Sequence, residues 1–252
     1  MHYRRLGKTN LQVSVIGIGT WQLGGEWGRD YTQAEADAIF DAARDCRINL
    51  IDTAECYGDH TSETLVGAAI QRDREKWVVA TKFGHKYTGP MQRSEPRSPA
   101  DVLRQLEDSL RALRTDYIDI LQYHSWGDEQ FYDDDVLAAL VKAKQQGKFR
   151  HLGNSVKGGG APGQVRHSTQ RGIEVIQIVY NRLNRQAEVD SFPACIEQDL
   201  GVLARVPLAS GWLSGKYRPG AQFPKSDTRS RQKPMTEDDP RWRELQAAIA
   251  EA

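Results

Sequence analysis

The sequence predicts an α/β fold built around a parallel β-sheet. Short apolar runs recur at fairly even spacing and are rich in Val, Ile or Leu, which is typical of strands buried on both faces. Amphipathic stretches lie between them, and repeated βα units imply parallel strands joined by right-handed crossovers. An open doubly wound sheet and a closed (β/α)8 barrel both fit this pattern. The predicted strands are Val15–Gly19, Leu50–Ala54, Trp77–Lys82, Tyr117–His124, His151–Ser155, Val175–Asn181 and Val202–Leu208.

The start of the chain predicts a small β-hairpin and then a helix. Tyr3–Leu6 and Leu11–Ser14 flank a turn-forming sequence that runs from Gly7 to Asn10, and this pattern favours a hairpin before the first buried strand. Thr32 and Glu35 fit a capping box, in which a hydroxyl and a carboxylate satisfy exposed backbone donors. We therefore expect a helix to begin just after Thr32.

Three further helices are predicted from their start and stop signals. Ser62 is a candidate cap for a helix with a buried apolar face. Ser98 followed by Pro99 marks another helix start. The segment Asp135–Gln146 is expected to be helical and to end at Gly147.

Two segments are predicted to be weakly ordered loops. Thr88–Arg97 and Ala221–Asp239 are polar, contain Pro and Gly, and lack periodicity. A last helical pattern surrounds Trp242, Leu245 and Ile249.

Composition and charge give no support for a nucleic-acid or membrane partner. Lys plus Arg equals Asp plus Glu, at 34 each, so charge balance favours neither nucleic acid nor an anionic membrane. No apolar run approaches the roughly 20 residues of a membrane helix, and the N-terminus lacks the apolar core of a signal peptide. Cys46, Cys56 and Cys195 have no CxxC spacing. We interpret them as reduced thiols of a cytoplasmic protein and predict no metal site.

Polar side chains end three consecutive predicted strands. Asp52 and Tyr57 follow the second strand, Lys82 ends the third and His124 ends the fourth. Ligands bind at the carboxyl ends of parallel strands in both candidate architectures. Each residue alone has an ordinary structural explanation, such as a turn cap or a salt bridge. Their convergence on one rim favours a functional site.

The chemistry of this set suits proton donation to a carbonyl oxygen. A phenol is a weak acid at neutral pH, and the ammonium of Lys82 is expected to lower the pKa of Tyr57. Asp52 would keep Lys82 charged, and His124 would hydrogen-bond the substrate carbonyl. A Schiff base on Lys82, as in an aldolase, is the alternative reaction. Pairing with Asp52 disfavours it, because a protonated lysine is a poor nucleophile.

Several sequence blocks together resemble the aldo-keto reductases, in particular the bacterial type that acts on small aldehydes, ketones or sugars. The resemblance extends from about residue 3 to about residue 218, and the order and spacing of the blocks make it specific. The blocks are Gly17-Ile18-Gly19-Thr20-Trp21, Asp52-Thr53-Ala54-Glu55-Cys56-Tyr57-Gly58, Ala80-Thr81-Lys82, Gly147-Lys148-Phe149-Arg150-His151-Leu152-Gly153 and Pro207-Leu208-Ala209-Ser210-Gly211-Trp212-Leu213-Ser214-Gly215-Lys216-Tyr217.

The resemblance implies a (β/α)8 TIM barrel that binds NADPH without a separate nucleotide domain. It implies NADP-dependent reduction of a small carbonyl or sugar-like substrate, with Tyr57 as acid, Lys82 and Asp52 as its tuning pair, and His124 orienting the substrate. Val156 departs from the Asn or Arg that the family often has after the residue matching Ser155. The cofactor-binding residues that the resemblance implies are Thr20, Trp21, Asp52, Ser155, Gln177, Leu208, Ala209, Ser210 and Lys216.

No eighth buried run follows the last predicted helix. We therefore expect residues 1–252 to form a single barrel domain that lacks its eighth βα unit. A truncated, inactive fragment is therefore one alternative to a working reductase. The resemblance implies a second alternative, a cofactor-binding regulatory barrel subunit. The sequence carries no signal that selects a monomer or a homo-oligomer.

Overall fold

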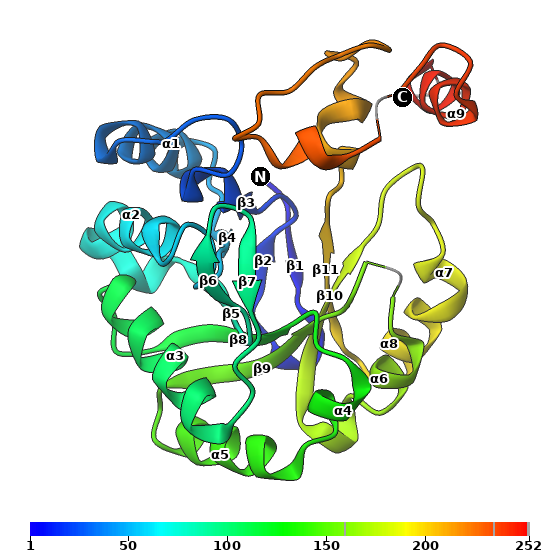
Figure 1. Cartoon of the computed structure of the whole chain (residues 1–252). Helices are drawn as coiled ribbons and strands as arrows, with labels where there is room; N and C mark the ends of the chain where they lie inside the picture. The colour runs from blue at the N-terminus through cyan, green and yellow to red at the C-terminus, as the bar shows by residue number, and fades with distance from the viewer. Residues whose placement is uncertain (159, 234, 251–252) are drawn as a thin grey trace.

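A seven-stranded parallel sheet forms the centre of the computed structural model, which describes residues 1–158, 160–233 and 235–250 (Figure 1). The strands lie side by side in chain order, so no reversal of order marks a doubly wound sheet. The sheet curls, and helices cover its outer side (Figure 1). The predicted α/β class with parallel strands is confirmed. In order along the sheet, the strands are β3 (Ile18–Gly19), β4 (Leu50–Asp52), β5 (Val78–Phe83), β8 (Ile118–His124), β9 (Phe149–Ser155), β10 (Ile173–Val179) and β11 (Gly201–Arg205).

The first and last strands, β3 and β11, are the two edges of this sheet in the described part of the chain. The first strand is shorter than predicted. Val15 and Ile16 are 48% and 59% exposed, because they form a bend in which the hydroxyl of Ser14 donates to the carbonyl of Ile16. The prediction of a buried strand from Val15 was therefore wrong at its beginning.

Several helix predictions are confirmed by their caps. Thr32 and Glu35 form a capping box at the start of α1 (Gln33–Asp45). Ser98 caps α3 (Pro99–Ala112) with Pro99 in the first turn. The remaining α-helices are α2 (Thr61–Ile70), α4 (Asp128–Phe131), α5 (Asp134–Gln145), α6 (Pro162–Arg166), α7 (Ala187–Asp190), α8 (Phe192–Glu197) and α9 (Pro240–Ala250), and the 3-10 helices are η1 (Gly7–Thr9), η2 (Trp21–Gly24), η3 (Gln71–Lys76), η4 (Thr169–Arg171), η5 (Ala209–Ser214) and η6 (Thr228–Arg231).

Ser62 does not cap α2, contrary to the prediction. It lies inside the helix, and His60 occupies the cap position without a side-chain cap bond. The Ser62 hydroxyl instead lies 2.9 Å from the backbone oxygen of Thr20 and 2.8 Å from its hydroxyl. A buried hydroxyl is costly without a partner, so this serine ties α2 to the end of β3.

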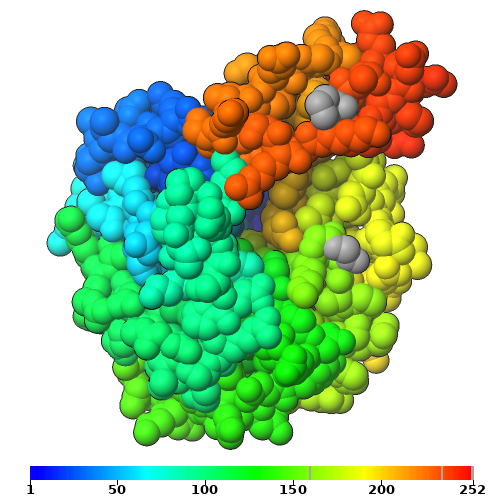
Figure 2. Space-filling model, in the orientation of Figure 1, coloured from blue at the N-terminus to red at the C-terminus, as the bar shows by residue number. Residues whose placement is uncertain are grey.

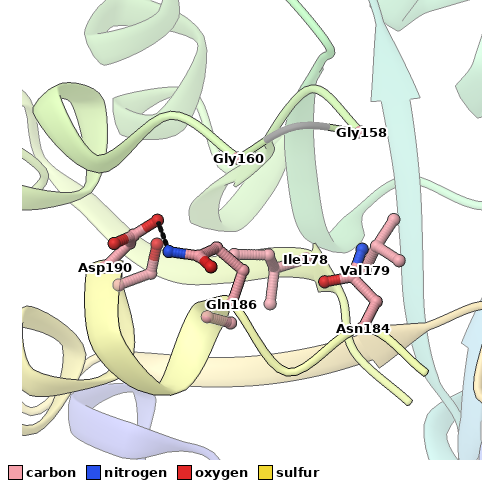
Figure 3. A pocket seen from close by; sticks show the side chains of 9 residues that line it. Gly158, Gly160, Ile178, Val179, Asn184, Gln186 and Asp190 are labelled. Carbon is pink, nitrogen blue, oxygen red and sulfur yellow. Dashed lines mark hydrogen bonds between the residues drawn. The ribbon is translucent and has the colours of Figure 1, made fainter. Parts of the chain in front are cut away.

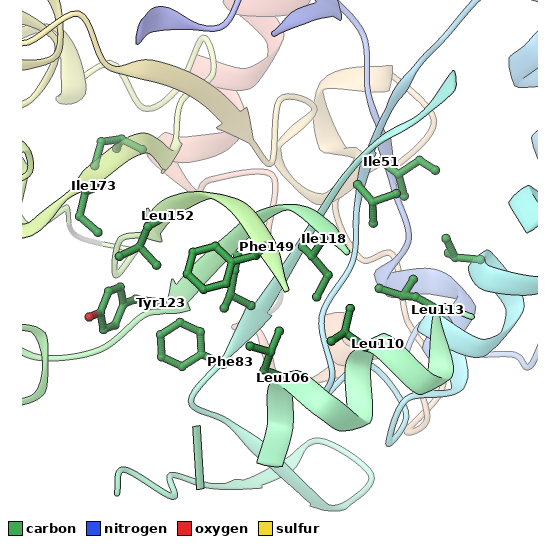
Figure 4. Packing of buried hydrophobic residues seen from close by; sticks show 14 of the residues in the cluster. Ile51, Phe83, Leu106, Leu110, Leu113, Ile118, Tyr123, Phe149, Leu152 and Ile173 are labelled. Carbon is green, nitrogen blue, oxygen red and sulfur yellow. The ribbon is translucent and has the colours of Figure 1, made fainter. Parts of the chain in front are cut away.

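Two apolar layers stabilise the curled sheet. The outer layer lies between strands and helices, where Leu106 and Leu110 of α3 point toward the strand side chains Phe83 and Ile118 (Figure 4). The inner layer lines the inside of the sheet. It includes two residues of the N-terminal segment and is formed by Leu6, Val13, Leu50, Val78, Ala80, Ile120, Val175 and Leu203. The sheet is therefore a packed structure on both faces, which holds the strand ends rigidly.

Two antiparallel hairpins accompany the sheet. The first pairs β1 (Tyr3–Arg5) with β2 (Gln12–Ser14). The second pairs β6 (Lys86–Gly89) with β7 (Gln92–Ser94), so the prediction of a loop over Thr88–Arg97 was wrong there. The hairpin has no apolar alternation because it stands out from the core.

The C-terminal part of the described chain crosses the top of the molecule in Figure 1. The segment predicted as a loop from Ala221 to Asp239 contains η6, and its residue 234 lies outside the described residues. Trp242 and Leu245 of α9 are buried, as their spacing predicted. Among the helices described, none is both long and apolar enough to cross a membrane.

Candidate active site

The ends of β4, β5 and β8 bring Asp52, Tyr57, Lys82 and His124 together. The Lys82 Nζ lies 2.8 Å from Oδ1 of Asp52 and donates to the Tyr57 hydroxyl at 3.2 Å. The rings of Tyr57 and His124 meet edge to face, with centroids 6.1 Å apart. Strand register explains the convergence, because Asp52 pairs with Ala80, two residues before Lys82.

Lys82 is 1% exposed, and its ammonium has three acceptors within hydrogen-bond distance. Besides Asp52 and Tyr57, it donates to the carbonyl of Thr53 at 2.7 Å. Burial by itself lowers the pKa of Lys82, but the charge of Asp52 and the neighbouring Tyr57 outweigh burial and raise it. A charged lysine with three acceptors is a poor nucleophile, which disfavours Schiff-base chemistry.

The pKa of Tyr57 differs from the sequence-based expectation. Burial raises it to about 12, and the opposing effect of Lys82 is smaller. The prediction that the Lys82 ammonium lowers the pKa of Tyr57 overall was therefore wrong. The loss of hydration destabilises the phenolate more than the nearby positive charge stabilises it. Tyr57 is a protonated donor over the whole neutral range, and Lys82 stabilises the phenolate that proton transfer would leave.

His124 is neutral and lies in an environment that the sequence did not reveal. Burial lowers its pKa well below the usual range, and Lys82 adds to the effect. The ring of His85 stacks on it with centroids 4.5 Å apart. The Cys56 Sγ lies 3.6 Å from Nδ1 of His124. A polar residue two positions after a strand end was the available signal for His85.

Thr20 and Trp21 both contact the segment that runs from Asp52 to Tyr57. Thr20 is 1% exposed, and its hydroxyl donates to the carbonyl of Asp52 at 3.0 Å. This hydrogen bond therefore fixes the backbone of Asp52. The Trp21 ring stacks on Tyr57, with centroids 5.8 Å apart. Its Nε1 donates to Glu26 at 2.9 Å.

A close backbone contact fixes the Tyr57 loop. A Cβ at Gly24 would lie 2.5 Å from the backbone carbon of Tyr57, and one at Gly58 would lie 2.4 Å from the oxygen of Gly24. Gly58 also has a φ of +68°, which favours glycine. The two glycines therefore let the loop lie directly against η2.

Ser155 and Gln177 extend the polar group along the sheet. Ser155 donates to Oε1 of Gln177 at 2.9 Å, and Gln177 donates to Oδ1 of Asp52 at 2.7 Å. Both side chains are buried. The structure thus joins these two predicted residues to the catalytic candidates through Asp52.

The loop after β11 carries the other predicted cofactor residues. Leu208 is 54% exposed, and Ala209 and Ser210 have φ values of 47° and 57°. Lys216 is exposed, with its ammonium 5.7 Å from the centroid of the Tyr217 ring. No interaction described for these four residues reaches Asp52, Tyr57, Lys82 or His124. Figure 2 shows the face hollowed between the β6–β7 hairpin and the segment that follows β11.

Arg205, at the end of β11, was not predicted. One terminal nitrogen donates to the carbonyl of Val156 at 3.0 Å, while Nε is buried without a partner among the described residues. Burial lowers its pKa, and Tyr57 and Asp52 oppose that effect. The sequence signal for Arg205 was a positively charged residue at the end of the apolar run that forms β11.

Glu26 was also missed, and it ties three segments together beside the site. Its carboxylate accepts from the Met91 amide at 2.6 Å and from Arg93 at 2.5 Å, in addition to Trp21. Its backbone carbonyl accepts from the amide of Thr228 at 2.9 Å. These contacts join η2, the β6–β7 hairpin and η6.

A second hollow lies between the loop after β9 and α7 (Figure 3). It measures about 150 Å³, and its residues include Ile178, Asn184 and Gln186, which donates to Asp190 at 2.7 Å. None of the four catalytic candidates lines it. We therefore assign the chemistry to the strand ends.

The curled parallel sheet thus carries at its strand ends the buried Lys82, in contact with the half-buried Asp52 and Tyr57, together with the neutral His124. The family model described as "Aldo/keto reductase family" matches residues 15–252. The chain belongs to this family. Membership favours an enzyme of NAD(P)H-dependent carbonyl reduction over a regulatory subunit or an inactive fragment.

Relatives of known sequence and structure agree with this family. The NADH-specific methylglyoxal reductase of Escherichia coli K12 is 34% identical over 235 residues, which cover 85% of this chain and 71% of that protein. The glycerol dehydrogenase AKR11B4 from Gluconobacter oxydans matches 99% of this chain and 76% of its own, with 33% identity and a TM-score of 0.82. The holo form of aldo-keto reductase AKR11C1 from Bacillus halodurans matches 89% and 73%, with 32% identity and a TM-score of 0.78.

Proposed function

We propose that this protein reduces an aldehyde or ketone to an alcohol with a nicotinamide cofactor, and that Tyr57 is the general acid. The observation that carries the proposal is the contact of the buried Lys82 with both Tyr57 and Asp52. A buried ammonium beside a phenol is suited to stabilising the phenolate left by proton transfer. Asp52 keeps that ammonium charged and in place.

In the proposed reaction the substrate carbonyl oxygen accepts a hydrogen bond from the Tyr57 hydroxyl. Neutral His124 holds the same oxygen from the other side and sets the orientation of the carbonyl. The Tyr57 proton moves to the oxygen as negative charge develops there. The bound cofactor supplies the hydride.

Residues near Asp52 have the chemistry to hold a nicotinamide. A Cβ at Gly19 would meet no atom within 4 Å, so there is open space at this position of β3, which pairs with Asp52 of β4. Ser155 and Gln177 offer hydroxyl and amide groups that suit a carboxamide. We propose that they hold the carboxamide, with Thr20 and Trp21 bordering the same space.

We propose that the loop after β11 holds the cofactor pyrophosphate through Leu208, Ala209, Ser210 and Lys216. Backbone amides in left-handed turns, together with one ammonium, are suited to an anion. We propose NADPH as the cofactor. Measuring kcat/KM with NADPH and with NADH tests this choice, and a preference for NADH would overturn it.

The proposed substrate is a small carbonyl or sugar-like compound. The names of two relatives, a methylglyoxal reductase and a glycerol dehydrogenase, support this class. We further propose that residues 1–252 act as one barrel domain. A cytoplasmic location is supported by the free thiols of Cys46, Cys56 and Cys195.

The substitution Tyr57→Phe tests the assignment of the acid. It removes one hydroxyl, so methylglyoxal reduction should fall by about 100-fold or more while cofactor binding persists. Tyr132→Phe is the matched control, because its hydroxyl contacts His167 on the surface. Equal rates in Tyr57→Phe and the parent would reject Tyr57 as the acid.

A further inference from the structure

Three metal-ligating side chains converge beside the proposed acid. Cys56 lies in the loop after β4, His85 follows β5 and His124 ends β8. One ligand atom from each lies within 4.8 Å of the corresponding atoms of the other two. No carboxylate belongs to the group. A thiolate and imidazoles favour Zn²⁺ or Cu⁺ over Mg²⁺ or Ca²⁺.

The spacing of Cys56 and His124 fits a tetrahedral zinc site. Zinc binds sulfur at about 2.3 Å and imidazole nitrogen at about 2.0 Å, so two such ligands lie roughly 3.5 Å apart in a tetrahedron. The observed distance between Sγ of Cys56 and Nδ1 of His124 is 3.6 Å. These two atoms can therefore bind one ion without moving.

His85 supplies an unused nitrogen. Its Nε2 is buried and has no hydrogen-bond partner in the described structure, which is costly for a polar atom. The rings of His85 and His124 are inclined by only 22°, so His85 must rotate to direct Nε2 at a shared ion.

Carboxylates balance two of the cations that surround the cluster. Lys82 is paired with Asp52 at 2.8 Å, and Arg93 is paired with Glu26 at 2.5 Å. Each of these two cations is thus matched by a carboxylate, and Arg205 and Lys157 are the further cations that lower the pKa of the two imidazoles. Coordination would convert the Cys56 thiol to a thiolate, with its proton released to solvent and no electron transferred.

We propose that Cys56, His85 and His124 form a binding site for a zinc-type cation, and that the bound ion inhibits the enzyme. Three protein ligands leave one position of a tetrahedral site for water. The ion occupies Nδ1 of His124 and fixes its ring, which prevents His124 from orienting a carbonyl. The inhibitory part of this proposal rests on the proposed function, whereas the binding part does not.

Titration of the full chain with Co²⁺ tests the binding part. We expect one equivalent to produce a sulfur-to-cobalt charge-transfer band, and Zn²⁺ to abolish that band. Cys56→Ser should remove the band, and His85→Gln should weaken binding by about 10-fold or more. Cys195→Ser is the matched control, because Cys195 is a second buried thiol. Loss of the band in Cys195→Ser but not in Cys56→Ser would overturn the site.

X-ray absorption of the zinc-loaded parent protein gives a test that needs no variant. One sulfur and two imidazoles should surround the ion. A shell of oxygen and nitrogen alone would overturn the assignment, even if a variant failed to fold.

A rate measurement with stoichiometric Zn²⁺ tests the inhibitory part. Methylglyoxal reduction should fall about 10-fold or more in the parent and stay unchanged in Cys56→Ser. Binding without inhibition in an active parent would overturn the regulatory role. A parent that binds Co²⁺ but never reduces carbonyls would instead overturn the proposed function and leave the site standing.

Discussion

Gln177 donates its side-chain amide to Oδ1 of Asp52 at 2.7 Å. The same carboxylate oxygen lies 2.8 Å from the ammonium of Lys82. The residue proposed to hold the nicotinamide carboxamide therefore also touches the group that keeps Lys82 charged. In the proposed site, one oxygen atom of Asp52 would therefore link cofactor binding to the acid.

Gln177→Leu should weaken both cofactor binding and catalysis. Loss of hydrogen bonds worth about 1 kcal/mol corresponds to roughly a 5-fold rise in cofactor Kd, and kcat should fall as well because Asp52 loses a partner. Fluorescence titration and steady-state kinetics measure the two effects. Gln145→Leu, at the exposed end of α5, is the control. A changed Kd with unchanged kcat would argue against the link.

Lys82→Met should destabilise the fold. The Asp52 side chain is 24% exposed and Lys82 only 1%, so the unpaired carboxylate is costly, by about 3 kcal/mol. Urea denaturation measures the loss. The double variant Asp52→Asn/Lys82→Met should recover part of the stability, because no charge is left unpaired.

An exposed ion pair provides the comparison for Lys82→Met. Lys144 pairs with Glu174 at 2.7 Å, and its side chain is 41% exposed. Lys144→Met should therefore cost less than about 1 kcal/mol. Equal losses in the two lysine variants would contradict the role of burial.

Glu55→Gln should flatten the pH dependence of stability. Burial, followed by the charge of Glu63, raises the pKa of Glu55 from 4.5 to about 9. Because the folded protein holds this proton more tightly than the unfolded chain, the contribution to stability is greatest at low pH. It declines as the pH rises from about 4.5 to about 9, by about 1.4 kcal/mol per pH unit. Denaturant unfolding at pH 6, 7 and 8 should show this slope in the parent and a reduced slope in Glu55→Gln. Parallel curves would show that Glu55 is ionised in the fold.

Gly24→Ala should impair catalysis without removing any polar group. The added Cβ would lie 2.5 Å from the backbone of Tyr57, so the loop must shift and the contact with Lys82 must lengthen. Displacements of this size cost about 10- to 100-fold in rate. The kcat should fall while cofactor Kd changes little. Gly163→Ala is the control, since its Cβ would meet no atom within 4 Å, and an equal effect there would refute the steric explanation.

The strand ends were predictable because buried parallel strands have a strong local signature. Asp52, Lys82 and His124 each end an apolar run, so the fold class and the convergence of these side chains at the strand ends followed from periodicity. Ser62 was misassigned because its partner Thr20 is 42 residues away. A local capping rule cannot represent such a contact.

Electrostatics and side-chain clusters needed the tertiary structure. The charged neighbour of Tyr57 was visible in the sequence, but the burial that outweighs it was not. Cys56, His85 and His124 come from three different strand ends, so no sequence spacing marks them as a metal site. Arg93 lies in a polar hairpin whose order depends on Glu26, a residue 67 positions away.

The bonds to Glu26 have a consequence for hydrogen exchange. Met91 and Thr228 lie in segments far apart in the chain, yet their amides both donate to Glu26. Arg231 adds a bond to the carbonyl of Met91 at 3.1 Å. Movement of the hairpin and η6 away from η2 would expose both amides at once, so deuterium should enter them at matching rates and report how often the mouth of the site opens.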